Sequence, residues 1–219
     1  MRNISMKTVC IGFLITLAVN GLVLAQDHLE EFVTAQNRFE HGLRGSKSDN
    51  ERAAEQFKSL SEQEQGNPLF LAYYGSTFTI RSRDAFMPWN KLKLGEQGLD
   101  IIDKALRMLA PEHDKVMMRG VPVSLETRLV AVSTFLKVPD KYFHRFDAGR
   151  SLLTETMKSR LFQVAPPQIQ ARFHFQAASV AQKEQKNAEE ACQLKRVLEL
   201  DPQGRDADAA RARLKELGL

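Results

Sequence analysis

The chain has 219 residues, of which 43% are hydrophobic and 26% are charged, with 31 Lys+Arg against 27 Asp+Glu. This length is that of a single domain. Charges alternate in sign along most of the chain, as on the solvated faces of helices, and no basic block is interleaved with aromatic residues. The composition therefore argues against a nucleic-acid-binding protein.

The first 25 residues have the layout of a secretory signal peptide. Arg2 and Lys7 precede an apolar stretch over 9–25, and polar sequence begins at Gln26. We expect cleavage between Ala25 and Gln26, which divides the chain into a signal peptide (1–25) and an exported domain (26–219). An uncleaved membrane anchor is the alternative. No later stretch is long enough to span a membrane, so we expect a soluble bacterial protein in the periplasm or secreted.

Signal removal leaves one cysteine, Cys192, so the exported domain has no intrachain disulfide and depends on its apolar core. Cys192 lies in a predicted helix beside Ala191, and we expect it to be partly buried and inert. Loss of Arg2 and Lys7 also leaves the basic and acidic residues nearly balanced.

Apolar residues at helical spacing occur along the whole exported domain, and alternation typical of strands is nearly absent. The predicted helices cover 27–43, 48–64, 68–83, 91–109, 124–138, 140–165, 167–186, 188–200 and 206–217. Ser48 and Ser124 are the expected N-caps of two of them. Pro88 places 84–90 in a connection, and residues 112–123 form a longer one. The sequence predicts an all-α fold of about four helical hairpins and a C-terminal capping helix.

The hairpin over 68–111 resembles a tetratricopeptide (TPR) repeat. Its matching positions are Leu71, Tyr74, Gly75, Phe78, Gly98, Ile102, Ala105 and Pro111. Elsewhere the repeats are degenerate and unequally spaced. The resemblance implies a helical solenoid that binds a protein or peptide through its concave side, and it implies no chemistry. The stretch 67–143 also resembles an uncharacterised group of exported bacterial proteins.

Gly75 and Gly98 occupy small-residue positions of this TPR-like hairpin, although glycine costs about 1 kcal/mol of helix propensity against alanine. We therefore expect a close contact between two helices at these glycines. Leucine at position 75 should overpack the contact, whereas alanine should be mild.

No motif of an enzyme or metal site is present, so the sequence predicts no catalytic, metal-binding or cofactor-binding residue. The densest ligand-like cluster is Glu112-His113-Asp114, which we interpret as a charged turn because adjacent side chains rarely converge on one ion. His144 and Asp147 have the spacing of a surface pair on a helix.

The most unusual local feature is the apolar sequence Phe86-Met87-Pro88-Trp89 inside a predicted connection. The favoured interpretation is a plug that folds back over neighbouring helices. The alternative is a partner-binding anchor of Phe86, Met87 and Trp89, because exposed aromatic and methionine side chains are enriched at interfaces.

The leading functional hypothesis is a scaffold or adaptor in the cell envelope that binds a protein or peptide between its hairpins. The alternative is a helical carrier of a small apolar ligand. An enzyme of unrecognised type is a third, less favoured hypothesis.

Overall fold

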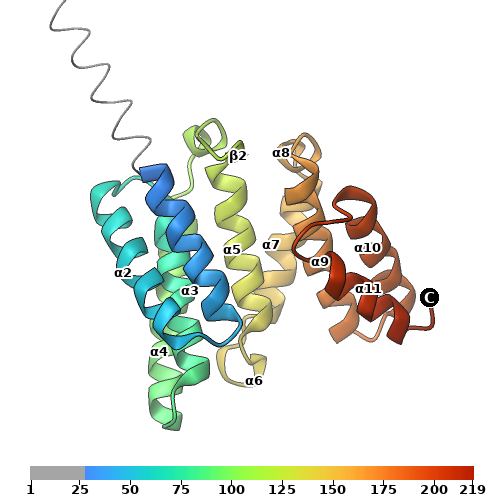
Figure 1. Cartoon of the computed structure of the whole chain (residues 1–219), viewed down its shortest axis with the longest axis horizontal. Coiled ribbons are helices and arrows are strands. Elements are labelled where there is room, and N and C mark those ends of the chain that lie inside the picture. Colours follow the sequence, from blue (N-terminus) through green and yellow to red (C-terminus); the bar gives the residue numbers. More distant parts are fainter. Residues whose placement is uncertain (1–27) are drawn as a thin grey trace, which may run out of the picture.

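The computed structural model describes residues 28–219, and these residues form an array of helical hairpins with almost no strand (Figure 1). The predicted signal peptide and its cleavage site at Ala25–Gln26 lie outside the described residues. In the part of the chain that is described, no helix is both long and apolar enough to cross a bilayer.

The helices follow one another across the molecule in chain order, from α2 at one side to α11 at the other (Figure 1). The first helix covers residues 28–43. The longer helices are α2 (Lys47–Gln63), α3 (Pro68–Asp84), α4 (Pro88–Arg107), α5 (Val123–Lys137), α7 (Phe146–Lys158), α9 (Pro167–Lys183), α10 (Asn187–Leu200) and α11 (Ala207–Glu216). The short elements are η1 (Pro111–Asp114), β1 (Met117–Met118), β2 (Val121–Pro122), α6 (Asp140–Phe143) and α8 (Arg160–Gln163).

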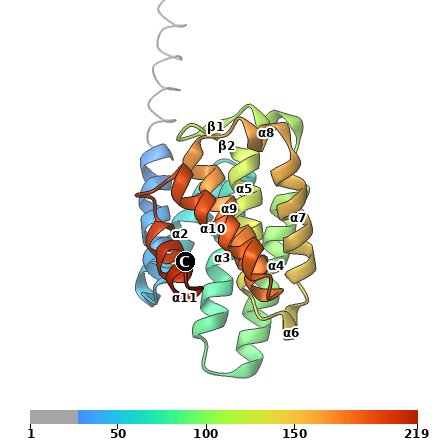
Figure 2. The same ribbon diagram turned by 90° about the vertical axis from the view of Figure 1, so that its right-hand side faces the viewer.

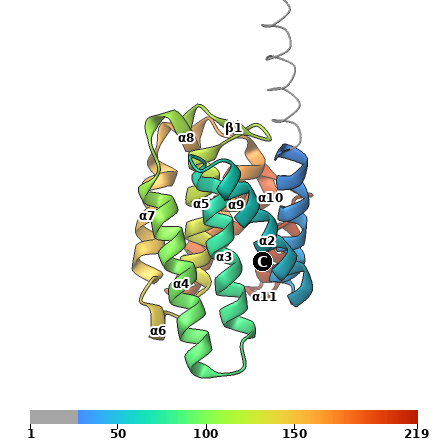
Figure 3. The ribbon, with the colours of Figure 1, turned by 90° about the vertical axis from the view of Figure 1, so that its left-hand side faces the viewer.

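The predicted pairing of helices is confirmed for three hairpins. Helix α3 packs on α4, α5 on α7, and α9 on α10. Successive hairpins meet through α3 with α5 and α5 with α9, and α11 covers α10 at the end of the array. Views from the two sides show α4 and α7 on one surface and α10 and α11 on another (Figures 2 and 3). The all-α hairpin array is therefore as expected.

Three predicted boundaries of helices are wrong. The N-cap of α2 is Ser46, whose hydroxyl accepts from the Asp49 N–H, so the helix begins before the predicted cap Ser48. Ser124 lies inside α5, and its hydroxyl donates to Asp114 Oδ1 (2.5 Å). Pro88 is the first residue of α4, where its missing N–H costs nothing, so Trp89 belongs to the first helical turn.

The predicted helix from Asp140 is interrupted. His144 adopts a left-handed conformation (φ 51°) after the single turn of α6, and the Asp140 carboxylate accepts from the Phe146 N–H at the start of α7. Asp147 pairs with Arg150 at 2.8 Å, so the expected pair with His144 is wrong.

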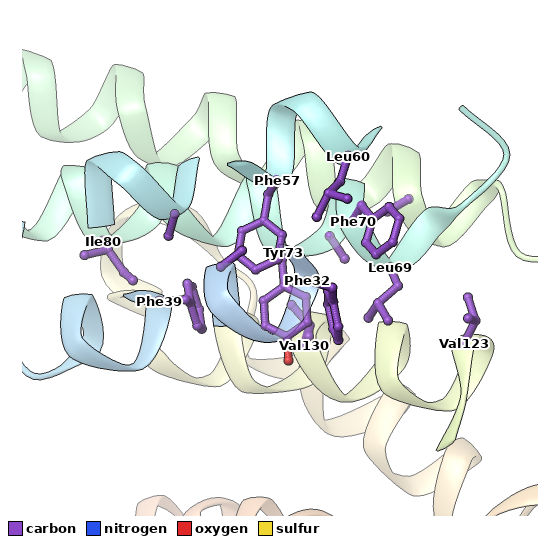
Figure 4. Packing of buried hydrophobic residues seen from close by; sticks show 14 residues of the cluster. Phe32, Phe39, Phe57, Leu60, Leu69, Phe70, Tyr73, Ile80, Val123 and Val130 are labelled. Atoms are coloured by element: carbon purple, nitrogen blue, oxygen red, sulfur yellow. The ribbon is translucent and has the colours of Figure 1, made fainter. Parts of the chain in front are cut away.

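The largest buried cluster joins the first helix to α2 and α3 through aromatic rings (Figure 4). Tyr73 stacks on Phe57 with centroids 4.8 Å apart, and Phe32 and Phe39 meet Tyr73 edge-on at 5.7 and 5.2 Å. Such pairs contribute about 0.5–1.5 kcal/mol each beyond the burial of their area. This cluster fixes the position of Tyr73, which also faces the cleft described below.

Gly75 of α3 and Gly98 of α4 face each other, as predicted. A Cβ atom at Gly75 would lie 2.7 Å from the Gly98 carbonyl oxygen, and one at Gly98 would lie 2.6 Å from that of Gly75. In each case the obstacle is a backbone carbonyl oxygen, which cannot move aside by a change of side-chain rotamer. Alanine at position 75 therefore requires a shift of the backbone, and we now expect it to be destabilising rather than mild.

The charged α11 is attached to the array by a buried ion pair. Glu190 of α10 is almost fully buried, and Arg213 of α11 donates to both of its oxygens (2.6 and 3.2 Å). The contacts with Glu190 and Glu216 raise the pKa of Arg213. Cys192 is exposed, which corrects its expected partial burial.

Candidate ligand-binding cleft

A cleft of about 730 Å³ lies between the hairpins. Its walls come from the first helix, α3, α5 and α9, and the connection between α10 and α11 also contributes. Its exposed lining residues include Phe86, Leu92 and Tyr142, which mark its mouth. The turn between α3 and α4 and the helix α6, which carry Phe86 and Tyr142, lie at the lower end of the molecule in Figure 1. This volume is within the range of small-molecule sites, roughly 300–1,000 Å³.

One side of the cleft is closed by contact between distant parts of the chain. Arg205, after α10, forms an ion pair with Glu40 of the first helix, 165 residues earlier. Arg205 also lies 3.6 Å from the Asp206 carboxylate. Burial raises the pKa of Asp206, although Arg205, Arg172 and Lys137 oppose the shift. Both carboxylates that line the cleft are thus paired with Arg205.

Most hydroxyl groups on the walls are already bonded to the protein. The Ser76 and Thr134 hydroxyls contact each other, and Thr134 also donates to the Val130 carbonyl (2.8 Å). Thr79 and Ser82 donate to backbone carbonyls of Ser76 and Lys91 at 2.8 and 2.6 Å. The walls therefore present mainly apolar groups, including Phe39, Ile80, Val130, Phe143 and Phe175.

Lys137 and Arg172, two cations of the cleft, form no ion pair and donate no side-chain hydrogen bond within residues 28–219, although the charges of Glu40 and Asp206 act on both. Lys137 is reached by water, yet protein surrounds it closely enough that desolvation lowers its pKa, and the charge of Arg205 adds to this. Burial opposes the charge of Arg172, but Tyr73, Glu126, Asp206 and Glu40 together outweigh burial and raise the pKa of this guanidinium.

A buried polar network lies behind the Tyr73 wall. Tyr73 donates to Glu126 Oε1 (3.0 Å), and Gln36 Nε2 donates to the Tyr73 hydroxyl (2.6 Å) and to Glu126 Oε1 (3.2 Å). Glu126 is fully buried, and its Oε2 atom has no hydrogen-bond partner. Burial, followed by the charge of Glu126, raises the pKa of Tyr73.

Arg119 supplies the positive charge of this network. Its guanidinium donates to Glu126 Oε1 (2.7 Å) and Gln36 Oε1 (2.5 Å) and lies 5.0 Å from the centre of the Phe32 ring. Arg119 and Gly120 both have positive φ (53° and 76°) in the turn between β1 and β2, as a tight two-residue hairpin turn requires. The small hairpin thus positions Arg119 over the core.

The structure contradicts the plug interpretation of Phe86-Met87-Pro88-Trp89. Phe86 is 88% exposed and Trp89 65% exposed, and Met87 is also exposed. Phe86 lies at the mouth of the cleft. Sequence reasoning missed Tyr142 and Leu92, which are exposed at the same mouth, because neither stands out in its own segment.

The first prediction follows from the exposure of Trp89, the only tryptophan in the chain. We expect emission at the wavelength of a water-exposed indole, with efficient quenching by iodide. Unfolding in guanidinium should shift the emission only slightly, because the indole is already in water. Blue emission that shifts to the red on unfolding would show that Trp89 packs inward.

The charged turn near His113 is structural. Its Nδ1 accepts from the Ala110 N–H (3.0 Å), and its Nε2 lies 3.0 Å from the Gly66 carbonyl oxygen. The Asp114 carboxylate accepts a hydrogen bond from the Ser124 hydroxyl and lies 4.0 Å from the Arg128 guanidinium. Within 28–219, no three His, Cys, Asp or Glu side chains are grouped to hold a metal ion.

Comparisons of the chain with protein-family models, curated proteins and solved structures gave no match. The fold and the cleft alone define the class of this protein: an all-α array of helical hairpins with a cleft between them. The residues of the cleft come from segments far apart in the sequence, and no local motif marks them.

Proposed function

We propose that this protein is a non-catalytic binding protein whose cleft holds an amphiphile with an anionic head group. The observation that carries the proposal is the pair of cations, Lys137 and Arg172, that form no ion pair in the described part of the chain and lie beside apolar walls. A carboxylate or phosphate group would contact these cations, and its hydrocarbon chain would lie against the aromatic and aliphatic walls.

Two other ligand classes fit the cleft less well. A wholly apolar ligand, as the carrier hypothesis supposed, would leave the charges of Lys137 and Arg172 facing hydrocarbon. An extended peptide needs acceptors for its N–H groups, but Glu40 and Asp206 are paired with Arg205. An anionic amphiphile satisfies both the charges and the apolar walls.

Binding of a fluorescent fatty acid, 11-(dansylamino)undecanoic acid, tests this proposal. We expect enhanced, blue-shifted dansyl emission and displacement by tetradecanoate at least tenfold more effectively than by tetradecanol, which lacks the charge. Arg172→Gln should weaken binding by roughly tenfold or more, since hydrogen bonds to charged groups contribute about 1.5–3 kcal/mol. Equal displacement by the alcohol, or no binding of the probe, would refute the anionic site.

Lys137→Gln separates binding from folding. The pKa of Lys137 is lowered in the folded protein, so its positive charge destabilises the folded state relative to the unfolded chain. This destabilisation is complete below the lowered pKa and disappears as pH rises from that pKa past the usual lysine value. At neutral pH the variant should therefore bind the probe more weakly without a lower melting temperature. Lys195 is an exposed residue of α10 that does not line the cleft, so Lys195→Gln is the matched control.

The scaffold hypothesis is the second candidate, and the exposure of Phe86, Met87 and Trp89 favours it. Exposed aromatic residues next to a cleft are common anchors of protein interfaces. The TPR-like hairpin also supports a protein or peptide partner. The signal-like sequence over 1–25 supports a periplasmic or secreted location for either function.

A further inference from the structure

Four exposed apolar side chains lie in the turn between α3 and α4 and at the start of α4, and a fifth lies on α6, which packs on α4. These residues, here called the aromatic tip, are Phe86, Met87, Trp89, Leu92 and Tyr142. Isolated exposed apolar residues are common on proteins, but a contiguous group indicates an interaction surface. Two members are the ring types, Trp and Tyr, that are enriched at the boundary between water and a bilayer.

Exposed basic residues surround the aromatic tip. They are Arg83, Lys91, Lys93 and Lys141. Asp84 is paired with Arg83 (2.7 Å), so these two charges cancel. Lys91, Lys93 and Lys141 then stand against Asp140 and the exposed Glu96, three positive charges against two negative. A surface that is apolar at its centre and basic at its rim is complementary to anionic lipid head groups over hydrocarbon.

The position of the aromatic tip also suits a flat partner. The turn between α3 and α4 extends past the other helices at one end of the molecule in all three views (Figures 1, 2 and 3). A planar surface would therefore meet this turn before any other part of the described chain.

We propose that the aromatic tip binds the surface of an anionic lipid bilayer, with Phe86 and Trp89 at the level of the head groups and Lys91 and Lys93 against lipid phosphates. This contact lies on the surface and does not span the bilayer. It is independent of what the cleft holds. Phe86 and Leu92 also line the mouth of the cleft, so docking at the tip turns that mouth toward the membrane.

The test follows Trp89 emission of the full chain during titration with vesicles. Vesicles of phosphatidylcholine and phosphatidylglycerol in equal parts should shift the emission to the blue, and nitroxide groups near the lipid head groups should quench it. Pure phosphatidylcholine should bind more than tenfold more weakly. Co-sedimentation with vesicles is not sufficient, because the apolar residues 9–25 can retain the chain on vesicles by themselves. Trp89 emission reports on the aromatic tip itself.

Variants identify the residues responsible. Phe86→Ser should weaken the response more than tenfold, and Lys91→Gln and Lys93→Gln should each weaken it about fivefold. Val164→Ser and Lys195→Gln, at exposed positions outside the tip, are matched controls that should change nothing. Trp89 emission that stays red with anionic vesicles would overturn the proposal and assign the aromatic tip to a protein partner.

Discussion

Replacing Arg119 with methionine should destabilise the fold by about 3–5 kcal/mol, because the fully buried Glu126 would lose the cation to which it is hydrogen-bonded. Methionine, like arginine, has a long unbranched side chain that can pack near Phe32. The variant therefore changes the charge more than the packing. For a domain of this size, the melting temperature should fall by roughly 10 °C. Urea denaturation followed by circular dichroism measures the change directly.

The double variant Arg119→Met/Glu126→Leu separates the charge from the packing. Removing both charges should recover most of the stability, since replacing a buried ion pair by apolar residues is often neutral or better. Tyr73 and Gln36 would keep their mutual hydrogen bond. Arg128→Met, on the helix that carries Glu126, is the control: the carboxylate partner of Arg128, Asp114, is half exposed and 4.0 Å away, so we expect a loss of about 1 kcal/mol or less. A double variant no more stable than the single one would show that packing of Arg119, not charge, matters.

Substitution of Gly75 should have the second large effect. Gly75→Ala should destabilise the protein by about 1–3 kcal/mol, because its Cβ atom meets the Gly98 carbonyl oxygen and forces α3 and α4 apart. Gly75→Leu should be worse, since its longer side chain points at Ile101 and Ile102. Thermal melts of both variants give the measurement.

Gly66→Ala provides the matched control for this prediction. No atom lies within 4 Å of a Cβ at Gly66, so alanine there should be tolerated. If Gly75→Ala melts like Gly66→Ala, the contact between α3 and α4 must relax without cost, and the two glycines are then not required for the hairpin.

The sequence predicted the helices well because their apolar stripes are buried in the structure, as at Phe57 and Leu60 of α2 or Ile102 and Ala105 of α4. The starts of helices were less predictable. Ser46 and Ser48 are equally good caps by residue type, and the choice between them depends on the turn at Gly45. Pro88 stops a preceding helix and also starts a following one, so its role is ambiguous in sequence.

The cleft was beyond sequence reasoning. Glu40, Lys137, Arg172 and Arg205 belong to four separate segments, and each alone resembles an ordinary surface charge. Only the packing of the hairpins brings them together. The error at Trp89 has a similar cause: an apolar segment predicts a contact, but the sequence does not say whether that contact is inside the molecule.

In open helical arrays each unit touches only its neighbours, so stability accumulates unit by unit and the ends fray first. The ion pair between Glu40 and Arg205 connects the two ends of this array. The connection after α10 therefore contacts the first helix, and the loss of either end of the array removes a contact from the other. A partly exposed ion pair contributes about 1 kcal/mol or less, so this contact adds little to the stability of hairpins that already pack on their neighbours.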